Sequence, residues 1–295
     1  MAIQSVQFKL NGQTYNLSFD SSAGVYKATV TAPSTTSYNE NSDHKFHGEV
    51  TVKDNAGNTT VATVQDFATL GLRVLEKVKP TIAVTYPTNS ALVSNNKPTI
   101  QWTVEDLGSG INPDTISIKI DNGATITTGI TKTKTDRGYS CEYTPTSVLD
   151  DGSHTVTFGV SDYDGNAANA VSSSFTVDTV PPTLNVEAPA DGYITNNPKL
   201  TVSGTSNDTV SSPVSVTVNG KAVTVASNGS FSTIVQLEEG ENTITVVATD
   251  AAGKSTTVTR QVILDTTAPV IQSVTLTPNP VDAGTTYIIT VAVSE

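Results

Sequence analysis

The chain has 295 residues, a formal net charge of −12 and one cysteine, Cys141, which cannot form a disulfide within the chain. Its 16 basic residues are scattered, which disfavours nucleic-acid binding, because neutralising phosphates requires a clustered basic face. No stretch is apolar enough for a membrane-spanning helix, and the first residues lack the basic and apolar segments of a secretion signal. We therefore expect no membrane insertion. The chain would leave the producing cell by assembly or lysis, or it is an excerpt of a longer sequence.

Three segments share one pattern and divide the chain: 48–58, 154–166 and 242–254. Each alternates apolar and polar residues, reaches an aspartate, and has a glycine three residues later. The alternation predicts a half-buried strand, and the glycine suits a turn with positive φ. Because Ser and Thr are abundant and no long amphipathic helical run is present, we predict an all-β protein.

Residues 1–78 form the first predicted module. Val6, Phe8 and Leu10 run into Asn11-Gly12, a hairpin-turn signal. The alternating stretch 26–30 then fits a further inward-facing strand. Compared with the following modules, this one starts at the third strand. We therefore expect an incomplete sandwich that lacks its first two strands.

An apolar insertion, Asp66–Leu75, separates the first anchor turn from the next module. It is either an extension that packs under the incomplete module or a contact surface for a partner. We favour the first interpretation.

Residues 79–178 form a complete predicted module of about seven short strands, the pattern of an immunoglobulin-like β-sandwich. Trp102 alternates in phase with Ile100 and Val104, so we expect it in the core rather than as an exposed platform for sugar stacking. Cys141 lies in a strand with the same alternation, which predicts a buried and unreactive thiol.

Residues 179–266 repeat this order of strands, with Asn219-Gly220 as a hairpin turn. The joints on either side of the module, 178–182 and 265–269, both run from an aspartate to a proline. Proline fixes φ and removes a hydrogen-bond donor, so we expect short, stiff joints and a rod of modules.

Residues 267–295 form a half-module of two strands. Val270–Leu276 fits a first strand and Tyr287–Ser294 a second, after which Glu295 stands where Asp106 follows the second strand of the complete module. The tail thus carries the two strands that the head lacks. Each end alone leaves an uncovered apolar face and open strand edges, which favour pairing with another chain.

No pattern in the sequence predicts catalysis or a cofactor. The histidines His44, His47 and His154 have no metal-ligand spacing, and no phosphate-binding glycine loop or nucleophile elbow is present. The aspartates that could ligate calcium, as in cadherin-like rods, are Asp162 with Asp164, Asp150 with Asp151, Asp178 and Asp265. Turn chemistry accounts for them without a metal, so we predict no cofactor and no enzyme, with calcium as the less favoured alternative.

On these motifs the chain resembles bacterial immunoglobulin-like repeats. The resemblance covers nearly all of the chain and rests on the loop Asp106–Ile111, the strand approach Asp151–Phe158, the Asp-x-x-Gly-Asn turn and the Asp-Thr-x-x-Pro joint. It implies tandem immunoglobulin-like β-sandwich modules, of the kind found in bacterial surface proteins and in tail or capsid appendages of bacteriophages. Such modules host many roles, so the resemblance is specific for the fold and not for the function.

We therefore expect a non-enzymatic structural protein of an extracellular assembly, namely a phage tail or other virion appendage. The last two strands of one chain would complete the first module of the next, a strand complementation that builds a filament. The expected interface residues are Val6, Phe8, Leu10, Val270, Val274, Leu276, Tyr287, Ile289, Val291 and Val293. The partners would be the chain itself or other virion or surface proteins.

Two alternatives remain open at this point. The two half-modules could dock on different partner proteins. The chain could also be an excerpt of a bacterial surface adhesin or of a carbohydrate-binding repeat array, with host-surface glycans as partners and the cell surface as its location.

Overall fold

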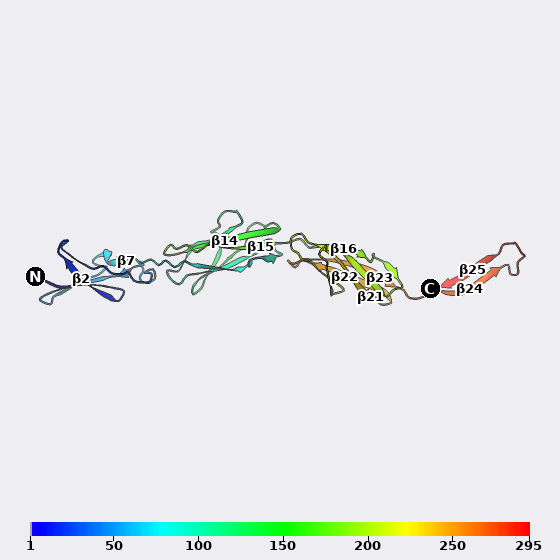
Figure 1. Cartoon of the computed structure of the whole chain (residues 1–295), viewed down its shortest axis with the longest axis horizontal. Helices are drawn as coiled ribbons and strands as arrows, with labels where there is room; N and C mark the ends of the chain where they lie inside the picture. The colour runs from blue at the N-terminus through cyan, green and yellow to red at the C-terminus, as the bar shows by residue number, and fades with distance from the viewer. Residues whose placement is uncertain (1) are drawn as a thin grey trace. The chain divides into compact units, whose positions relative to one another are not determined.

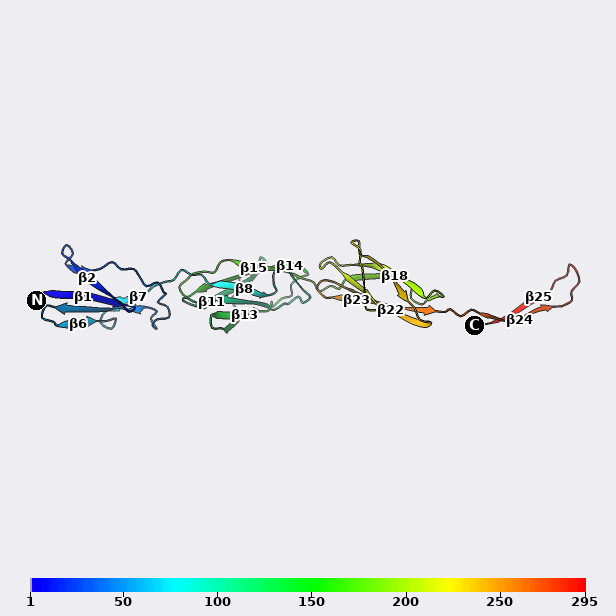
Figure 2. The ribbon, with the colours of Figure 1, turned by 60° about the horizontal axis from the view of Figure 1, so that its bottom comes forward.

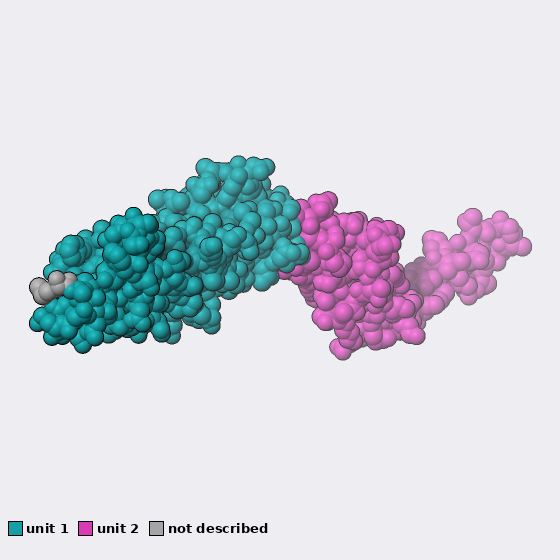
Figure 3. Space-filling model, turned by 60° about the vertical axis from the view of Figure 1, so that its left-hand side comes forward, with its two compact units in different colours: residues 1–177 teal, residues 178–295 magenta. Residues whose placement is uncertain are grey.

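The computed structural model describes residues 2–295, which form β-strands and a single turn of 3-10 helix, η1 (Ala68–Leu70). The chain divides into two compact units, one ending at Val177 and one beginning at Asp178 (Figure 3). The predicted all-β fold class is confirmed. No helix within residues 2–295 has the length and apolar character needed to cross a membrane.

The first unit opens with a five-stranded sheet in the order β3-β2-β1-β5-β6 (Figure 2). Asn11 and Gly12 join its first two strands with φ angles of 44° and 73°, the backbone that a tight two-residue hairpin requires. The strands of this sheet are β1 (Ile3–Leu10), β2 (Gln13–Asp20), β3 (Val25–Lys27), β5 (Glu49–Asp54) and β6 (Thr59–Ala62).

The stretch 26–30 differs from the prediction. Its first residues belong to β3, which lengthens the sheet beyond β2, and residues 28–34 lie in no strand. Phe19 of β2 is the direct partner of Tyr26, and their rings lie 5.2 Å apart. This cross-strand aromatic contact holds residues 25–27 on the edge of the sheet, and the predicted strand over 26–30 ends at Lys27.

One face of the five-stranded sheet is apolar. The register places Val6 beside Leu17 and Val52, and Phe8 beside Tyr15. Only part of that face is covered: outside this sheet, the strands among residues 2–78 are the two short ones β4 (Phe46–His47) and β7 (Gly71–Leu72), which pair with each other.

The insertion Asp66–Leu75 contributes to this cover. Val74 forms a small buried cluster with Leu10 and Phe46, and Ser37 donates from its backbone amide to the Val74 carbonyl at 3.0 Å. The expectation that the insertion packs against the incomplete module is therefore confirmed.

The second module of the first unit is a sandwich of two four-stranded sheets, β12-β13-β10-β8 and β11-β14-β15-β9. Its strands are β8 (Thr81–Tyr86), β9 (Ala91–Val93), β10 (Ile100–Glu105), β11 (Ile111–Ile120), β12 (Thr131–Lys134), β13 (Gly138–Tyr143), β14 (Gly152–Asp162) and β15 (Val171–Val177).

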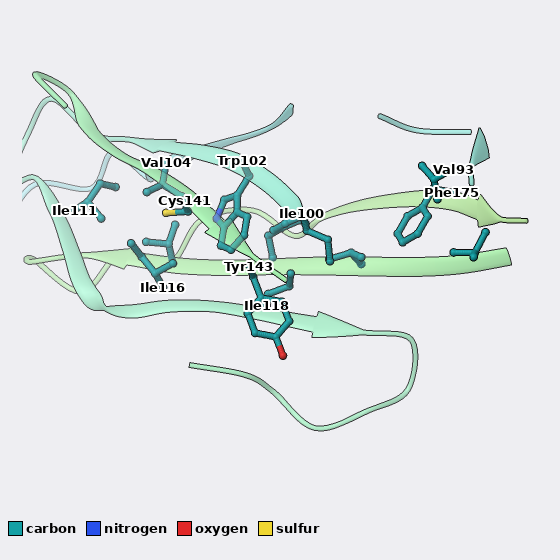
Figure 4. Close-up of a cluster of buried hydrophobic side chains, with 14 residues drawn as sticks. Val93, Ile100, Trp102, Val104, Ile111, Ile116, Ile118, Cys141, Tyr143 and Phe175 are labelled. Carbon is teal, nitrogen blue, oxygen red and sulfur yellow. The ribbon is translucent and has the colours of Figure 1, made fainter. Parts of the chain in front are cut away.

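Between these sheets lies a core of 14 buried residues (Figure 4). Trp102 is 1% exposed and its ring lies 5.1 Å from that of Phe158 on the facing sheet, so its predicted place in the core is confirmed. Cys141 is fully buried, and this burial raises the pKa of its thiol to about 11. The thiol therefore stays protonated near neutral pH, which agrees with the predicted lack of reactivity.

The second unit begins with a similar sandwich, built from the sheets β16-β18-β21 and β17-β23-β22-β19-β20 (Figure 1). Its strands are β16 (Thr183–Ala188), β17 (Tyr193–Thr195), β18 (Lys199–Asn207), β19 (Ser215–Val218), β20 (Lys221–Val223), β21 (Ser230–Gln236), β22 (Gly240–Thr249) and β23 (Ser255–Leu264). Inward-facing residues such as Val202, Val246 and Val262 are fully buried between the two sheets.

The second unit ends in a hairpin of β24 (Val270–Thr277) and β25 (Ile288–Ser294), which pair antiparallel and form a two-stranded sheet of their own (Figure 2). All eight residues of β24 are exposed. The hairpin therefore has no second layer within the second unit.

Candidate functional site

The β24–β25 hairpin presents an apolar face. Six large apolar side chains share one side of it, as the paired residues Ile271 with Val293, Val274 with Val291, and Leu276 with Ile289. All six are exposed, from 44% for Leu276 to 65% for Ile271. The opposite side is more polar and carries the pairs Thr275 with Thr290 and Thr277 with Ile288. A hairpin that leaves one continuous apolar face exposed is the pattern of a sandwich strand pair that lacks its opposing sheet.

The hairpin corresponds to β8 and β10 of the complete module. Thr81 pairs with Glu105 there as Val270 pairs with Ser294 here, and an acidic residue follows the second strand in both. In this alignment Ile289, Val291 and Val293 take the positions of the buried β10 residues, which are Ile100, Trp102 and Val104.

The remaining predicted interface residues of the tail lie nearby. Val270 is 61% exposed on the polar side of the hairpin, opposite Ser294. Tyr287 is exposed and directly precedes β25.

The predicted interface residues of the head, Val6, Phe8 and Leu10, all lie on β1. Both edges of β1 are already paired, with β2 on one side and β5 on the other. No further strand can therefore add to β1 through main-chain hydrogen bonds. Contact with it has to be made face to face, over the apolar side of the sheet.

That face is only partly closed. Val6 and Leu10 are buried, whereas Phe19, on the same side of the sheet, is 57% exposed. Residues 28–34, which follow β3, belong to no strand. The head thus combines a partly open apolar face with a segment outside any strand, and the β24–β25 hairpin belongs to the other unit.

Two clusters of carboxylates are the other notable feature of the chain. Glu76, Asp106 and Asp162 each offer an oxygen within 4.8 Å of the others, and so do Asp178, Asp208 and Asp250. We call these the first and the second acidic triad. Each joins a residue of the preceding linker to two residues of the module that follows.

Two members of the second triad, Asp178 and Asp250, are almost completely buried. Asp178 accepts a hydrogen bond from the Ser211 hydroxyl, and Asp208 Oδ1 accepts one at 2.7 Å from the Ser211 backbone amide. Asp250 Oδ1 accepts a bond of 2.9 Å from the Lys254 amide, whereas Asp250 Oδ2 is buried without a hydrogen-bond partner. A buried carboxylate oxygen without a donor, beside two further carboxylates, fits a cation ligand.

The first triad is bonded in a similar way. Ser109 donates its backbone amide to the Glu76 carboxylate, and the Gly110 amide donates to Asp106 Oδ2 at 2.6 Å. Asp162 Oδ1 accepts the Asn166 amide at 2.8 Å. Either triad could hold a hard cation such as Ca²⁺, which prefers carboxylate and carbonyl oxygens.

Of the aspartates that the sequence singled out for calcium, the structure places only Asp162 and Asp178 in a triad. Asp164 instead forms an ion pair with Arg73 and accepts the Thr36 hydroxyl at 2.6 Å, which joins the head to the second module. The sequence analysis missed Glu76, Asp106, Asp208 and Asp250. One signal was available: Glu76 and Asp178 both stand four residues before the proline that opens a module.

A groove of about 320 Å³ beside the first triad is lined by Tyr38, Tyr139 and Tyr163. The rings of Tyr38 and Tyr163 stack on each other with centroids 4.5 Å apart, and the His44 ring stacks 4.0 Å from Tyr38. Both faces of Tyr38 are therefore occupied within the protein. The ring is not an open platform for a sugar.

Comparison with known proteins agrees with the two sandwiches. Residues 80–157 match the family model "Bacterial Ig domain", and residues 182–266 match the model "Glucodextranase, domain B". The chain is 37% identical over 124 residues to bacillopeptidase F of Bacillus subtilis (strain 168). That match covers 42% of this chain and only 8% of the length of that relative.

Solved structures similar to the chain include other tandem modules. The fibronectin(III)-like modules of CbhA from Clostridium thermocellum align with 17% identity and a TM-score of 0.39, over 63% of this chain and 94% of theirs. Sidekick-1 immunoglobulin domains 1–5 align with 12% identity and a TM-score of 0.36, over 92% of this chain and 56% of theirs. The two family matches fall on the two closed β-sandwiches, so the chain contains two tandem immunoglobulin-like domains, the first of which matches the bacterial Ig domain model.

Proposed function

We propose that this chain is a non-enzymatic structural subunit of an extracellular assembly, and that its copies join head to tail. The observation that carries the proposal is the exposed apolar face of β24–β25, whose β25 positions match the buried β10 residues Ile100, Trp102 and Val104 of the complete module. The β24–β25 hairpin of one copy covers the open apolar face of β1 and β2 in the next. Residues 28–34, which belong to no strand, supply the backbone to which β25 bonds, as β13 bonds to β10 in the complete module.

The size of the apolar face supports this arrangement. Fully burying a side chain such as Val, Leu or Ile is worth about 1.5–3 kcal/mol, so six of them give on the order of 10 kcal/mol. Association costs roughly 4–15 kcal/mol in lost freedom of movement. The two quantities are comparable, so self-association should depend on protein concentration.

A pair of substitutions on the two faces of β25 tests the joint. Val291→Asp places a charge in the proposed interface, and Thr290→Asp places the same charge on the polar face one residue away. We expect Val291→Asp to weaken self-association about 100-fold or more, because a buried unpaired charge is costly. Thr290→Asp should assemble like the unmodified chain.

Sedimentation velocity over a range of concentrations, together with electron microscopy, measures the result. Phe19→Asp, on the open face of the head, should have the same effect as Val291→Asp. A chain that stays monomeric at the highest concentration reached, or equal behaviour of the two β25 variants, would rule out the joint.

We assign the assembly to a virion appendage such as a phage tail, and keep the bacterial cell surface as the second candidate. The resemblance to appendage repeats supports the first, and the match to a Bacillus subtilis protein supports the second. Immunoblots of purified particles and of cell-surface fractions distinguish the two. Signal confined to the cell surface would contradict the virion assignment.

A further inference from the structure

The second acidic triad lies wholly within the second unit and draws on three separate segments of it. Asp178 is the first residue of the unit, Asp208 directly follows β18, and Asp250 directly follows β22. One carboxylate oxygen from each of the three lies within 4.8 Å of the others. Negative charges held this close repel one another, so the charged form of the cluster requires a positive charge beside it.

No basic side chain supplies that positive charge. None of the ion pairs among residues 2–295 includes Asp178, Asp208 or Asp250. Solvation by bulk water is also restricted, because Asp178 is 0% exposed and Asp250 is 5% exposed. A buried carboxylate that has neither water nor a basic partner is costly, and a bound cation removes this cost.

The oxygen Asp250 Oδ2 points to such a ligand directly. The other oxygen of this carboxylate, Oδ1, accepts the Lys254 backbone amide at 2.9 Å. Oδ2 is buried and has no hydrogen-bond donor. Buried polar atoms in folded proteins nearly always have a partner, so an oxygen without one, next to two further carboxylates, is a candidate metal ligand.

The equivalent turn of the first triad supplies a donor for the same oxygen. Asn166 donates its backbone amide to Asp162 Oδ1 and its side-chain amide to Asp162 Oδ2, both at 2.8 Å. The residue that follows Asp250 by the same four positions is Lys254, which has no side-chain amide. The two turns therefore share the bond to Oδ1 and differ at Oδ2, where only the second turn leaves the carboxylate to another partner.

The donor set and its spacing suit Ca²⁺. All three carboxylates lie outside the strands, and Ca²⁺ accepts the irregular arrangement of ligands that loops provide. Oxygens bind Ca²⁺ at roughly 2.3–2.6 Å, so two ligands of one ion are at most about 5 Å apart. The separations of up to 4.8 Å in the triad agree with this limit. The hydroxyl of buried Ser211, which bonds to Asp178, adds a further oxygen to the site.

We infer that Asp178, Asp208 and Asp250 bind one Ca²⁺ ion, with Asp250 Oδ2 among its ligands. The ion neutralises the cluster and connects the start of the second unit to the loops that follow β18 and β22. The site does not depend on the proposed head-to-tail joint, because none of its residues belongs to the head or to the β24–β25 hairpin.

The test is calorimetric titration of the whole chain with CaCl₂, after bound calcium has been removed with a chelator. We expect a dissociation constant of about 1 mM or tighter. Asp250→Asn and Asp208→Asn each keep the size of the side chain and remove one charge, so each should weaken binding at least about tenfold. The side-chain oxygen of Asn at position 250 can still accept the Lys254 amide, and circular dichroism checks that both variants are folded.

Two further variants make the test specific. Glu241→Gln removes an exposed charge from β22 outside the triad, and this control should bind Ca²⁺ like the unmodified chain. Lys254→Asn restores the side-chain amide that satisfies Oδ2 in the first triad. We expect it to weaken Ca²⁺ binding about tenfold, because the amide competes for Asp250 Oδ2. Removing the positive charge of Lys254 would by itself act in the opposite direction.

Three results would overturn the inference. The unmodified chain could fail to bind Ca²⁺, or Asp250→Asn and Asp208→Asn could both bind it with undiminished affinity, which would place the ion elsewhere. Binding to Lys254→Asn that is as tight as to the unmodified chain, or tighter, would exclude Asp250 Oδ2 as a ligand. None of these results affects the joint between copies, which Val291→Asp tests separately.

Discussion

Strands β10 and β25 have the same alternation and opposite environments. In β10 the inward positions Ile100, Trp102 and Val104 are at most 1% exposed, whereas in β25 Ile289 is 59% exposed and Val293 is 63% exposed. The difference lies outside the strands: β10 faces the sheet that contains β11 and β14, and β25 faces no second sheet in its unit. Alternation therefore defines which face of a strand is apolar, and only an opposing sheet decides whether that face is buried.

The largest contrast should appear in hydrogen exchange of the dilute monomer. Core strands exchange through global opening, which costs about 5–15 kcal/mol in a typical domain, while an isolated hairpin is marginally stable. We expect amides of β10 to exchange about a thousandfold or more slowly than those of β25. Comparable protection of both strands in a verified monomer would mean that the hairpin is covered within its own chain.

Truncating equivalent residues extends the comparison. Trp102→Ala should lower the free energy of unfolding of its module by about 3–5 kcal/mol, because it leaves a cavity in a closed core. Val291→Ala, at the matching position of the tail, should change the stability of the monomer by less than about 0.5 kcal/mol. Urea unfolding followed by Trp102 fluorescence and by circular dichroism measures both. Similar losses at the two sites would contradict the alignment of β10 with β25.

A truncation in the head should lower the free energy of unfolding by an amount between the losses for Trp102→Ala and Val291→Ala. Phe46 is 3% exposed but belongs to a cluster of only three buried residues, whose surroundings can relax after a truncation. We expect Phe46→Ala to cost about 2 kcal/mol, below the range for a closed core. Phe67→Ala, at a position 59% exposed, is the control and should stay within about 0.5 kcal/mol. A loss above about 4 kcal/mol for Phe46→Ala would indicate a closed core in the head.

The smallest expected effect is a pH dependence confined to the complete module. Partial burial alone would lower the pKa of His154, but the Asp150 carbonyl, 2.7 Å from its Nε2, and the Asp121 carboxylate raise that pKa above its usual value of 6.5. A raised pKa stabilises the folded state fully below about pH 6.5 and loses this contribution as the pH rises through the folded-state pKa.

The unfolding midpoint of the second module should therefore fall slightly between pH 6 and about pH 8 in the unmodified chain. His154→Gln should remove that part of the pH dependence, which the difference between the two profiles isolates. Parallel profiles would mean that the imidazole is not stabilised in its charged form.

The sequence predicted the features that depend on local pattern. Alternation placed Trp102 and Cys141 in the core, and Asn11-Gly12 marked a hairpin turn that the structure contains. The strand predicted over 26–30 ends at Lys27, and the sequence could not tell which strand it would pair with, because alternation does not specify the neighbour; the structure pairs it with β2, where Phe19 contacts Tyr26.

The acidic triads could not be found from spacing alone. Glu76 and Asp162 are far apart in the chain, and each aspartate separately satisfies the needs of its own turn. Only the fold shows that the linker acid reaches the turns of the next module. Asp250 Oδ2, left without a donor, is a property of packing that no residue pattern encodes.

The bonds around Asp164 fix the head to the second module, which matters for the proposed joint between copies. Asp164 belongs to the second module and is held by Arg73, by the Thr36 hydroxyl and by the Glu76 amide, all from the head and its linker. Its side chain is completely shielded from water. In the proposed head-to-tail joint, the hairpin therefore docks on a head that is already fixed to the second module. The joint then does not have to order that linker in addition to the ordinary cost of association.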